Sequence, residues 1–378
     1  MTNKGGLDGI IVADVTTSLV DGVNGKLIYS GYKIEDLAEH AQFEEVVYLL
    51  FHNRLPKADE LEDIRRTIAK EAAIPAEIIN MLKQLPKDAN PMAILRTAVS
   101  ALSHYDPQSE NLTDKAIAYE IALRLHGQIT TISAAWDRIR KGKEPIAPRE
   151  DYNLAQNFVY MLTGEAPQEA AVAGFNAYLV LLAEHGMNAS TFAARVVTAT
   201  GSDFYSAVVG AIGTLKGPSH GGANAEAMRM FLEIGEVENV EPWFNENIKN
   251  GTRRIMGIGH RIYKATDPRA AILRERAKEL AEGAGNTKWF EIADNLANLA
   301  RADEYFIERK LYPNVDYYSA IMLYTLDLDV DMFVPLFAMS RIAGWAANII
   351  DQMGGRLIRP ESNYIGPEGL TWTPIEDR

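Results

Sequence analysis

The chain has 378 residues, of which 47% are hydrophobic and 24% charged, a composition typical of a globular protein with a large buried core. Its net charge of -13 argues against nucleic-acid binding as the main activity but allows a local basic pocket. The absence of cysteine excludes disulfides, thiolate metal sites and a cysteine nucleophile. We find no apolar signal segment and no apolar run of ~18 residues, so we expect a cytoplasmic protein.

The first 32 residues are predicted to be extended, and Asn24-Gly25 favours a tight hairpin turn. Apolar residues then recur at helical spacing along almost the whole chain, with prolines in polar surroundings between the runs. Helices are predicted at about residues 43–51, 57–72, 91–104, 114–140, 151–163, 167–184 and 190–215.

Two later changes in composition suggest how the domains are organised. Residues 190–215 carry few charges, which predicts a helical stretch buried in a core or a subunit interface. Residues 223–310 are more charged and suggest a second domain. Apolar character returns at 317–350, where a helix is predicted to continue beyond Arg341. No repeat or long linker separates these parts, so two domains would have to be interleaved.

Three histidines lie in turns flanked by glycine, and a carboxylate and spaced arginines follow them. His220 stands between Gly217-Pro218 and Gly221-Gly222, just before a predicted helix. A helix N-terminus disfavours the imidazolium, so a neutral ring that donates to a carbonyl oxygen is expected. The alternative is a histidine that only caps a buried turn.

His260 closes a Gly-x-Gly-His turn that has Arg261, Lys264 and Arg269 nearby. Glycines and cations in one loop can hold phosphates or carboxylates. A lone Gly-x-Gly is weak evidence, because the preceding strand of a dinucleotide-binding unit is missing. The alternative is a solvated basic loop.

His185 and Asp316 leave similar choices open. His185 follows a predicted helix, and Asn188 and Ser190 resemble caps of the next one, so a satisfied buried histidine is the alternative. Asp316 follows Pro313-Asn314-Val315 at the start of an apolar helix, where an aspartate is usually an N-cap. To act as a base, Asp316 must reach a carbon acid.

Other site types fit this pattern less well. The three histidines match no compact zinc-ligand spacing, and no His-Glu-x-x-His motif is present. A serine hydrolase is disfavoured because no Gly-x-Ser-x-Gly elbow is present. The set would instead suit an enolisation between two acids. Histidines can polarise two carbonyls, a carboxylate can remove a proton from carbon, and arginines can hold a dicarboxylate.

These residues resemble the citrate synthase family, in its short dimeric bacterial and archaeal form. The resemblance extends over the chain and depends on Pro-x-His-Gly-Gly-Ala, Gly-x-Gly-His-Arg-x-Tyr-Lys with Asp-Pro-Arg, and Asn-Val-Asp. It implies an all-α, two-domain fold with a short N-terminal β-hairpin. The large domain would comprise residues 1–221 and 328–378 and the small domain residues 222–327, with the active site between them.

The resemblance also implies roles for individual residues. Asp316 would remove a methyl proton from acetyl-CoA, His220 would hold the enol, and His260 would polarise the ketone of oxaloacetate. Citryl-CoA would then be hydrolysed to citrate and CoA, with no metal or cofactor. The oxaloacetate-binding residues would be His185, Arg269, Arg341 and, from the other subunit of a homodimer, Arg359. The candidates for contacts to the CoA phosphates are Arg261, Lys264, Arg309 and Lys310.

Two residues depart from the family pattern. Ser219 stands where Leu or Ile is common, and Glu361 stands where a basic residue is common, so Glu361 places an acid two residues from Arg359. The close alternative is 2-methylcitrate synthase, which uses propionyl-CoA on the same scaffold, since one methylene changes binding by only ~1–3 kcal/mol. An alternative from another class is a catalytically silent helical scaffold.

Overall fold

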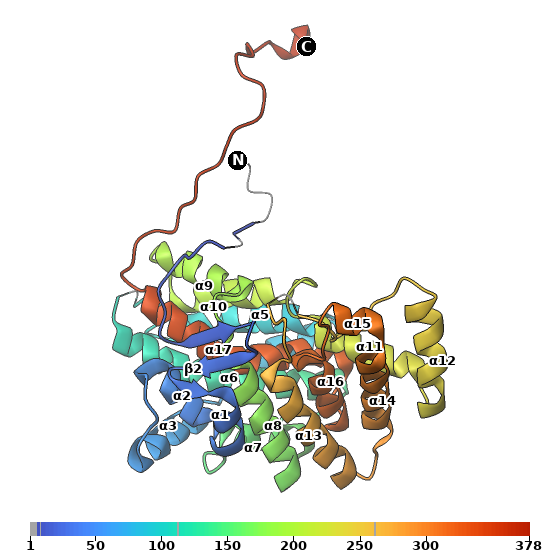
Figure 1. Ribbon diagram of the computed structural model, residues 1–378. Coiled ribbons are helices and arrows are strands. Elements are labelled where there is room, and N and C mark those ends of the chain that lie inside the picture. The colour runs from blue at the N-terminus through green and yellow to red at the C-terminus, as the bar shows by residue number, and fades with distance from the viewer. Residues whose placement is uncertain (1–5, 8, 112, 261) are drawn as a thin grey trace.

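The computed structural model describes residues 6–7, 9–111, 113–260 and 262–378 and is mostly helical (Figure 1). Its sheet has three short antiparallel strands in sequence order: β1 (Ser18–Asp21), β2 (Lys26–Tyr29) and β3 (Tyr32–Lys33). In the turn between β1 and β2, the Asp21 carboxylate accepts hydrogen bonds from the amides of Val23 and Asn24, at 3.1 and 3.0 Å. Gly25 has a φ of +63°, a conformation that glycine adopts without strain. The predicted hairpin is thus confirmed, and so is the all-α fold class.

The first part contains the predicted helical stretches in order, together with two short helices at residues 34–40 and 76–84 that were not predicted. Several helices begin at caps that the sequence supplies. The side chains of Asn90, Asp114 and Asp203 accept hydrogen bonds from amides of the following first turn. These helices are α1 (Ile34–His40), α2 (Phe43–His52), α3 (Ala58–Lys70), α4 (Ala76–Gln84), α5 (Pro91–Leu102), α6 (Lys115–Arg140), α7 (Leu154–Thr163), α8 (Glu169–Leu182), α9 (Ala189–Ala199) and α10 (Phe204–Leu215).

One predicted helix is wrong in its extent. The stretch 190–215 is divided, because α9 ends at Ala199 and α10 begins at Phe204. Gly201, with a φ of +78°, and the N-cap Asp203 make the break. The two helices pack against each other as neighbours, and both lie along one face of the body (Figure 1).

The second part begins with α11 (Ala223–Ile234), α12 (Val240–Phe244), which a π-turn at Asn245–Lys249 extends, α13 (Pro268–Gly283), α14 (Lys288–Ala302), α15 (Glu304–Glu308) and α16 (Val315–Thr325). The chain then returns to the core with α17 (Phe333–Gln352). The apolar stretch 317–350 thus comprises most of α16 and α17, with a connection between them. As predicted, α17 continues past Arg341.

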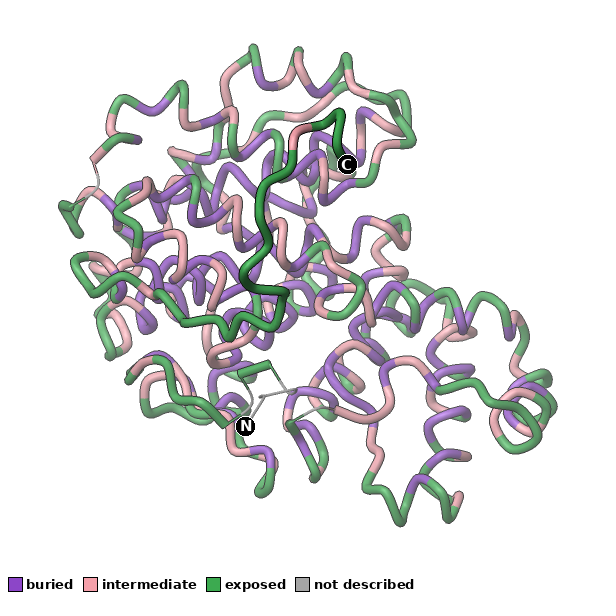
Figure 2. The backbone as a smooth tube through the Cα atoms, turned by 90° about the horizontal axis from the view of Figure 1, so that it is seen from above, coloured by how far each residue is buried: buried purple, intermediate pink, exposed green. Residues whose placement is uncertain are grey.

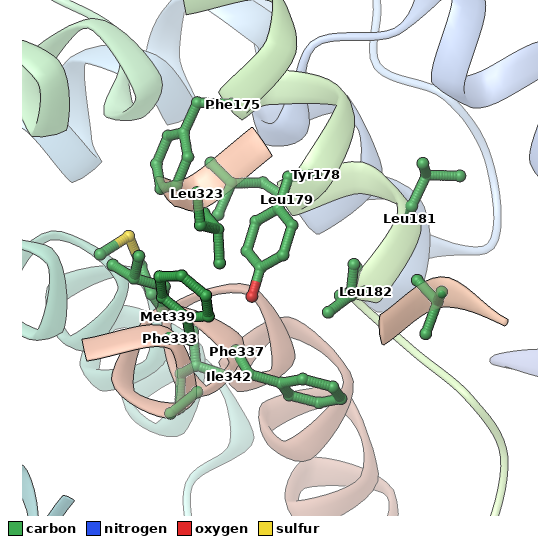
Figure 3. Packing of buried hydrophobic residues seen from close by; sticks show 14 of the residues in the cluster. Phe175, Tyr178, Leu179, Leu181, Leu182, Leu323, Phe333, Phe337, Met339 and Ile342 are labelled. Atoms are coloured by element: carbon green, nitrogen blue, oxygen red, sulfur yellow. The ribbon is translucent and has the colours of Figure 1, made fainter. Parts of the chain in front are cut away.

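Helix α17 forms the centre of the core and packs on α6, α8, α9 and α10. Figure 3 shows Phe175 and Tyr178 of α8 facing Phe333, Phe337 and Ile342 of α17. The segment Val330–Gln352 is long and apolar enough to cross a membrane, but 89% of its apolar window is buried inside the protein. Its hydrophobicity is therefore explained by its central position in the fold.

The chain beyond α17 differs from the rest. Residues from Gly354 onward are almost all exposed, as the colours of Figure 2 show, and Figure 1 shows this segment leaving the globular body. It carries exposed apolar side chains, among them Tyr364, Ile365 and Trp372. Such a segment has little to stabilise it within a single copy of the chain.

Candidate active site

Two loops that are far apart in sequence pair to form one wall of the site. The Gly259 amide donates to the Tyr312 carbonyl at 2.8 Å, and the Asn314 amide donates to the Gly257 carbonyl at 2.9 Å. Gly257 has a φ of +78°, and a Cβ on it would lie 2.9 Å from the Cα of Tyr317. Glycine is therefore required here for both conformation and space. The pairing places His260 beside the start of α16.

Asp316 is the second residue of α16, and its carboxylate accepts no hydrogen bond from the described residues. The N-cap is Asn314, whose side-chain oxygen accepts from the Asp316 amide at 2.9 Å. The alternative that Asp316 is only an N-cap is therefore wrong. Burial raises the pKa of Asp316 to about 6; the charge of Asp267 adds to the rise, and those of Arg269 and Arg341 oppose it. This carboxylate is a stronger base than an ordinary aspartate and remains ionised near neutral pH.

His220 lies in the turn three residues before α11, as predicted. The Ser190 amide donates to Nε2 of His220 at 3.3 Å, and the Ser190 hydroxyl lies 2.8 Å from the same nitrogen. Because an amide can only donate, Nε2 is an acceptor and the ring proton lies on Nδ1. Burial, and then the charge of Arg341, lower the pKa of His220 to about 4, so the ring is neutral near pH 7. Trp345 holds Ser190 in place by donating to its hydroxyl at 3.0 Å.

His260 has the opposite tautomer. Its Nδ1 accepts hydrogen bonds from the amides of Ile262 and Tyr263, both at 3.1 Å, so its proton lies on Nε2. Burial, and then the charge of Arg269, lower the pKa of His260 to about 4. The loop therefore presents a neutral ring with one N–H donor, which a simple solvated basic loop would not require.

His185 is buried, and its ring lies edge-on to that of His260 at 5.6 Å between centroids. Its Nε2 lies 3.2 Å from the Tyr263 hydroxyl. Burial and two nearby arginines, Arg269 and Arg341, hold the pKa of His185 well below its ordinary value. His185 is thus a hydrogen-bonded buried histidine that also belongs to the cluster of site residues.

Two arginines are buried beside these histidines. Arg269, 1% exposed, forms a two-point ion pair with Asp267 at 3.0 and 2.9 Å, and this pair holds the pKa of Asp267 below its ordinary value despite burial. Arg341, 2% exposed, donates to the Leu182 carbonyl at 2.7 Å and stacks on Phe337. No carboxylate of the described residues lies within 4 Å of Arg341. Buried Glu184 is the carboxylate whose charge acts most on Arg341, but no ion pair joins the two, so Arg341 can still bind an anionic ligand.

The comparisons with known proteins agree with this geometry. The family model described as "Citrate synthase, C-terminal domain" matches residues 6–361. Citrate synthase 2 of Bacillus subtilis is 46% identical over 380 residues, which is 100% of both chains. The chain belongs to the citrate synthase family. A second Bacillus subtilis relative, 38% identical over 97% of both chains, carries the name citrate/2-methylcitrate synthase.

Solved structures of the family have the same fold. Citrate synthase from Pyrobaculum aerophilum superposes with a TM-score of 0.93 at 39% identity, over 98% of this chain and 94% of the other. Citrate synthase from Thermoplasma acidophilum, solved in a ternary complex with carboxymethyl coenzyme A and oxaloacetate, gives a TM-score of 0.90 at 33% identity, over 98% of both chains. The architecture described above is therefore the architecture of this family.

Sequence reasoning missed four residues that shape the site. Ser190 was considered only as a cap, and Asp267 only as part of a motif, although an Asp before Pro and a helix is an N-cap signal. Tyr263 gave no signal of its own. Glu184 is buried beside His185, where burial raises its pKa, and one of its carboxylate oxygens has no hydrogen-bond partner among the described residues.

The residues expected to contact CoA are only partly brought together. A cleft of about 1060 Å³ opens beside His260, and Arg309 lines it together with Arg254. Lys264 and Lys310 are exposed and do not line this cleft, and Arg261 lies outside the described residues. The structure thus adds Arg254 as a candidate for a phosphate contact.

Arg359 is not part of the site within one chain. It is exposed on the C-terminal segment, and it makes no ion pair or hydrogen bond with the described residues. The neighbouring Glu361 is also exposed, as is Ser219 before His220. The described residues contain no group of three or more His, Asp or Glu side chains that could hold a metal ion.

Proposed function

We propose that the chain condenses acetyl-CoA with oxaloacetate and hydrolyses the resulting citryl-CoA to citrate and CoA. One observation carries the proposal. The basic carboxylate of Asp316 shares a site with two neutral histidines, His220 and His260, whose proton positions are fixed by backbone amides, and with two buried arginines. This set suits the removal of a proton from carbon next to a thioester.

The chemistry follows from the donor and acceptor atoms. Asp316 takes one methyl proton of acetyl-CoA while the Nδ1–H of His220 donates to the thioester oxygen, which stabilises the enol. The enol carbon forms a bond to the ketone carbon of oxaloacetate, and the Nε2–H of His260 donates to the ketone oxygen as it becomes a hydroxyl. Water then cleaves the thioester of citryl-CoA, and citrate and the free thiol of CoA are released. No metal or redox cofactor enters these steps.

The binding of oxaloacetate is assigned to His185, Arg269 and Arg341, with Arg359 contributed by a second copy of the chain. Arg341 supports this assignment because it is buried without a carboxylate partner among the described residues. One guanidinium nitrogen of Arg269, Nη1, is not bonded to Asp267 and is free for a second anion. The exposed C-terminal segment that carries Arg359 supports a homodimer in which this segment reaches the other subunit.

We also propose that two interleaved domains close over the substrates, the large one comprising residues 1–221 and 328–378 and the small one residues 222–327. His260 and Arg269 would belong to the small domain, and His185 and Arg341 to the large one. Closure would exclude water before enolisation. The cleft beside His260, with Arg254 and Arg309, would hold CoA. A cytoplasmic location remains our expectation.

Thiol release with oxaloacetate plus acetyl-CoA, and separately propionyl-CoA, tests the proposal. We expect a higher kcat/KM with acetyl-CoA and citrate as the product identified by mass spectrometry. A preference for propionyl-CoA would favour 2-methylcitrate synthase, the activity in the name of one relative. Thiol release with neither substrate would favour a silent scaffold and refute the proposal.

A further inference from the structure

The turn of the N-terminal hairpin, residues 21–25, packs against the loop that carries His260. The Lys264 amide donates to the Gly22 carbonyl at 2.8 Å. Gly22 is buried, and a Cβ on it would lie 2.3 Å from the carbonyl oxygen of Ile262. At the other end of the turn, a Cβ on Gly25 would lie 2.8 Å from the carbonyl oxygen of Thr266. The turn and the loop therefore meet backbone to backbone along residues 262–266.

The turn is rigid enough to hold this loop. The Asp21 carboxylate accepts from the amides of Val23 and Asn24 and from the Asn24 side chain, the last at 2.7 Å. Asp21 and Lys26 are partners in the strand register, so the turn is also closed at its base. The side chain of Val23 is 77% exposed and lies on the outside of the turn.

The part of the loop that the turn contacts is also the part that orients His260. The amides of Ile262 and Tyr263 are the two donors to Nδ1 of His260. The Tyr263 hydroxyl, in addition, lies 3.2 Å from His185. A shift of the Ile262 backbone would therefore remove the hydrogen bonds that fix the His260 tautomer.

We propose that the hairpin turn, residues 21–25, is a positioning element for His260. It docks on residues 262–266 and keeps the two amides on Nδ1, so that Nε2–H is the donor presented to the substrate. The catalytic consequence rests on the function proposed above, whereas the docking does not. The turn and the loop belong to different proposed domains, so the docking is also a contact between these two domains.

Gly22→Ala tests the proposal, because the φ of Gly22 is not in the left-handed region and the three atoms nearest to an added methyl group all belong to Ile262. Amide hydrogen exchange of peptides covering residues 259–266 should become at least about tenfold faster, with peptides of α6 unchanged. The kcat for thiol release should fall about tenfold or more, with the Kd of oxaloacetate changed much less. Val23→Ala, on the same turn but away from the loop, should match wild type in both measurements.

Two further variants keep the test decisive. Gly25→Ala should act in the same direction. Asp21→Ala, which removes the three hydrogen bonds that close the turn, should also speed the exchange and covers the case in which Gly22→Ala does not fold. Unchanged exchange of residues 259–266 in a folded variant would overturn the proposal. So would faster exchange with an unchanged kcat, because the turn would then hold the loop without positioning His260. If the wild-type chain released no thiol, the proposed function would fail, and faster exchange would still support the docking.

Discussion

Acidification is the perturbation whose effect on the proposed reaction follows most directly from the structure. The pKa of Asp316 is raised to about 6, mainly by burial, so its carboxylate takes up a proton as the pH falls through that value. A protonated Asp316 cannot remove a methyl proton from acetyl-CoA. Activity should therefore be lost on the acid side, and the midpoint of the loss should lie about two units above the pKa of an ordinary aspartate.

This pKa sets the size of the loss of activity. About nine-tenths of Asp316 is ionised near pH 7, and only about one-tenth near pH 5, so kcat/KM should fall about tenfold over that range. His220 and His260 do not contribute to this limb, because burial lowers the pKa of each to about 4 and both are already neutral. A single carboxylate should therefore account for the acid limb above about pH 5.

The assay is kcat/KM for acetyl-CoA, at saturating oxaloacetate, between about pH 4.5 and 8. Circular dichroism at each pH controls for unfolding, and Asp316→Glu should move the midpoint while leaving one ionisation. A rate that stays constant down to about pH 5 would refute the assignment of Asp316 as a base with a raised pKa. If the acid-side midpoint of kcat/KM were the same in Asp316→Glu as in wild type, the ionisation would belong to another group.

Three further predictions concern stability, assembly and closure. Gly344→Ala should lower the free energy of unfolding by about 2 kcal/mol or more in a denaturant titration, because its Cβ would lie 2.0 Å from a carboxylate oxygen of buried Glu184 and 2.6 Å from the Ala183 carbonyl. An unchanged midpoint of denaturant unfolding would contradict this packing. Gly283→Ala is the control, because a Cβ there meets nothing within 4 Å. Arg359→Ala and His220→Ala, each inactive alone, should recover about a quarter of wild-type activity when refolded together, because half of the dimers are mixed and each has one intact site. No recovery, with heterodimers shown by mass spectrometry, would place Arg359 in its own subunit's site or outside it. Small-angle scattering should show a smaller radius of gyration with saturating oxaloacetate, and an unchanged value would count against domain closure.

The parts of the fold that follow from local sequence were predictable. The Asn24-Gly25 turn, the caps Asp114 and Asn188 and the apolar periodicity of α17 each act within a few residues. The two helices that were not predicted and the one that was predicted too long also have local causes. Helix α1 has seven residues and α4 has nine, too few for a clear period, and the Gly201 break is a short interruption in an apolar run.

The site was only partly predictable, because its geometry depends on contacts between distant residues. His220 and Ser190 are 30 residues apart, and Arg341 and Leu182 are 159 apart. The tautomers of His220 and His260 follow from backbone amides whose directions no motif records. Asn314 shows the same limit, since the pattern Asn-Val-Asp does not tell which residue caps α16 and which is left free.

Asp316→Asn provides the most direct test of the central claim that Asp316 removes the proton from acetyl-CoA. The substitution keeps the shape of the side chain and removes its basicity, and Asn314 still caps α16. We expect kcat for thiol release to fall on the order of 10²–10⁴-fold, while the Kd of oxaloacetate, measured by calorimetry, remains close to the wild-type value. A folded Asp316→Asn variant that keeps more than about a tenth of wild-type kcat would contradict the account.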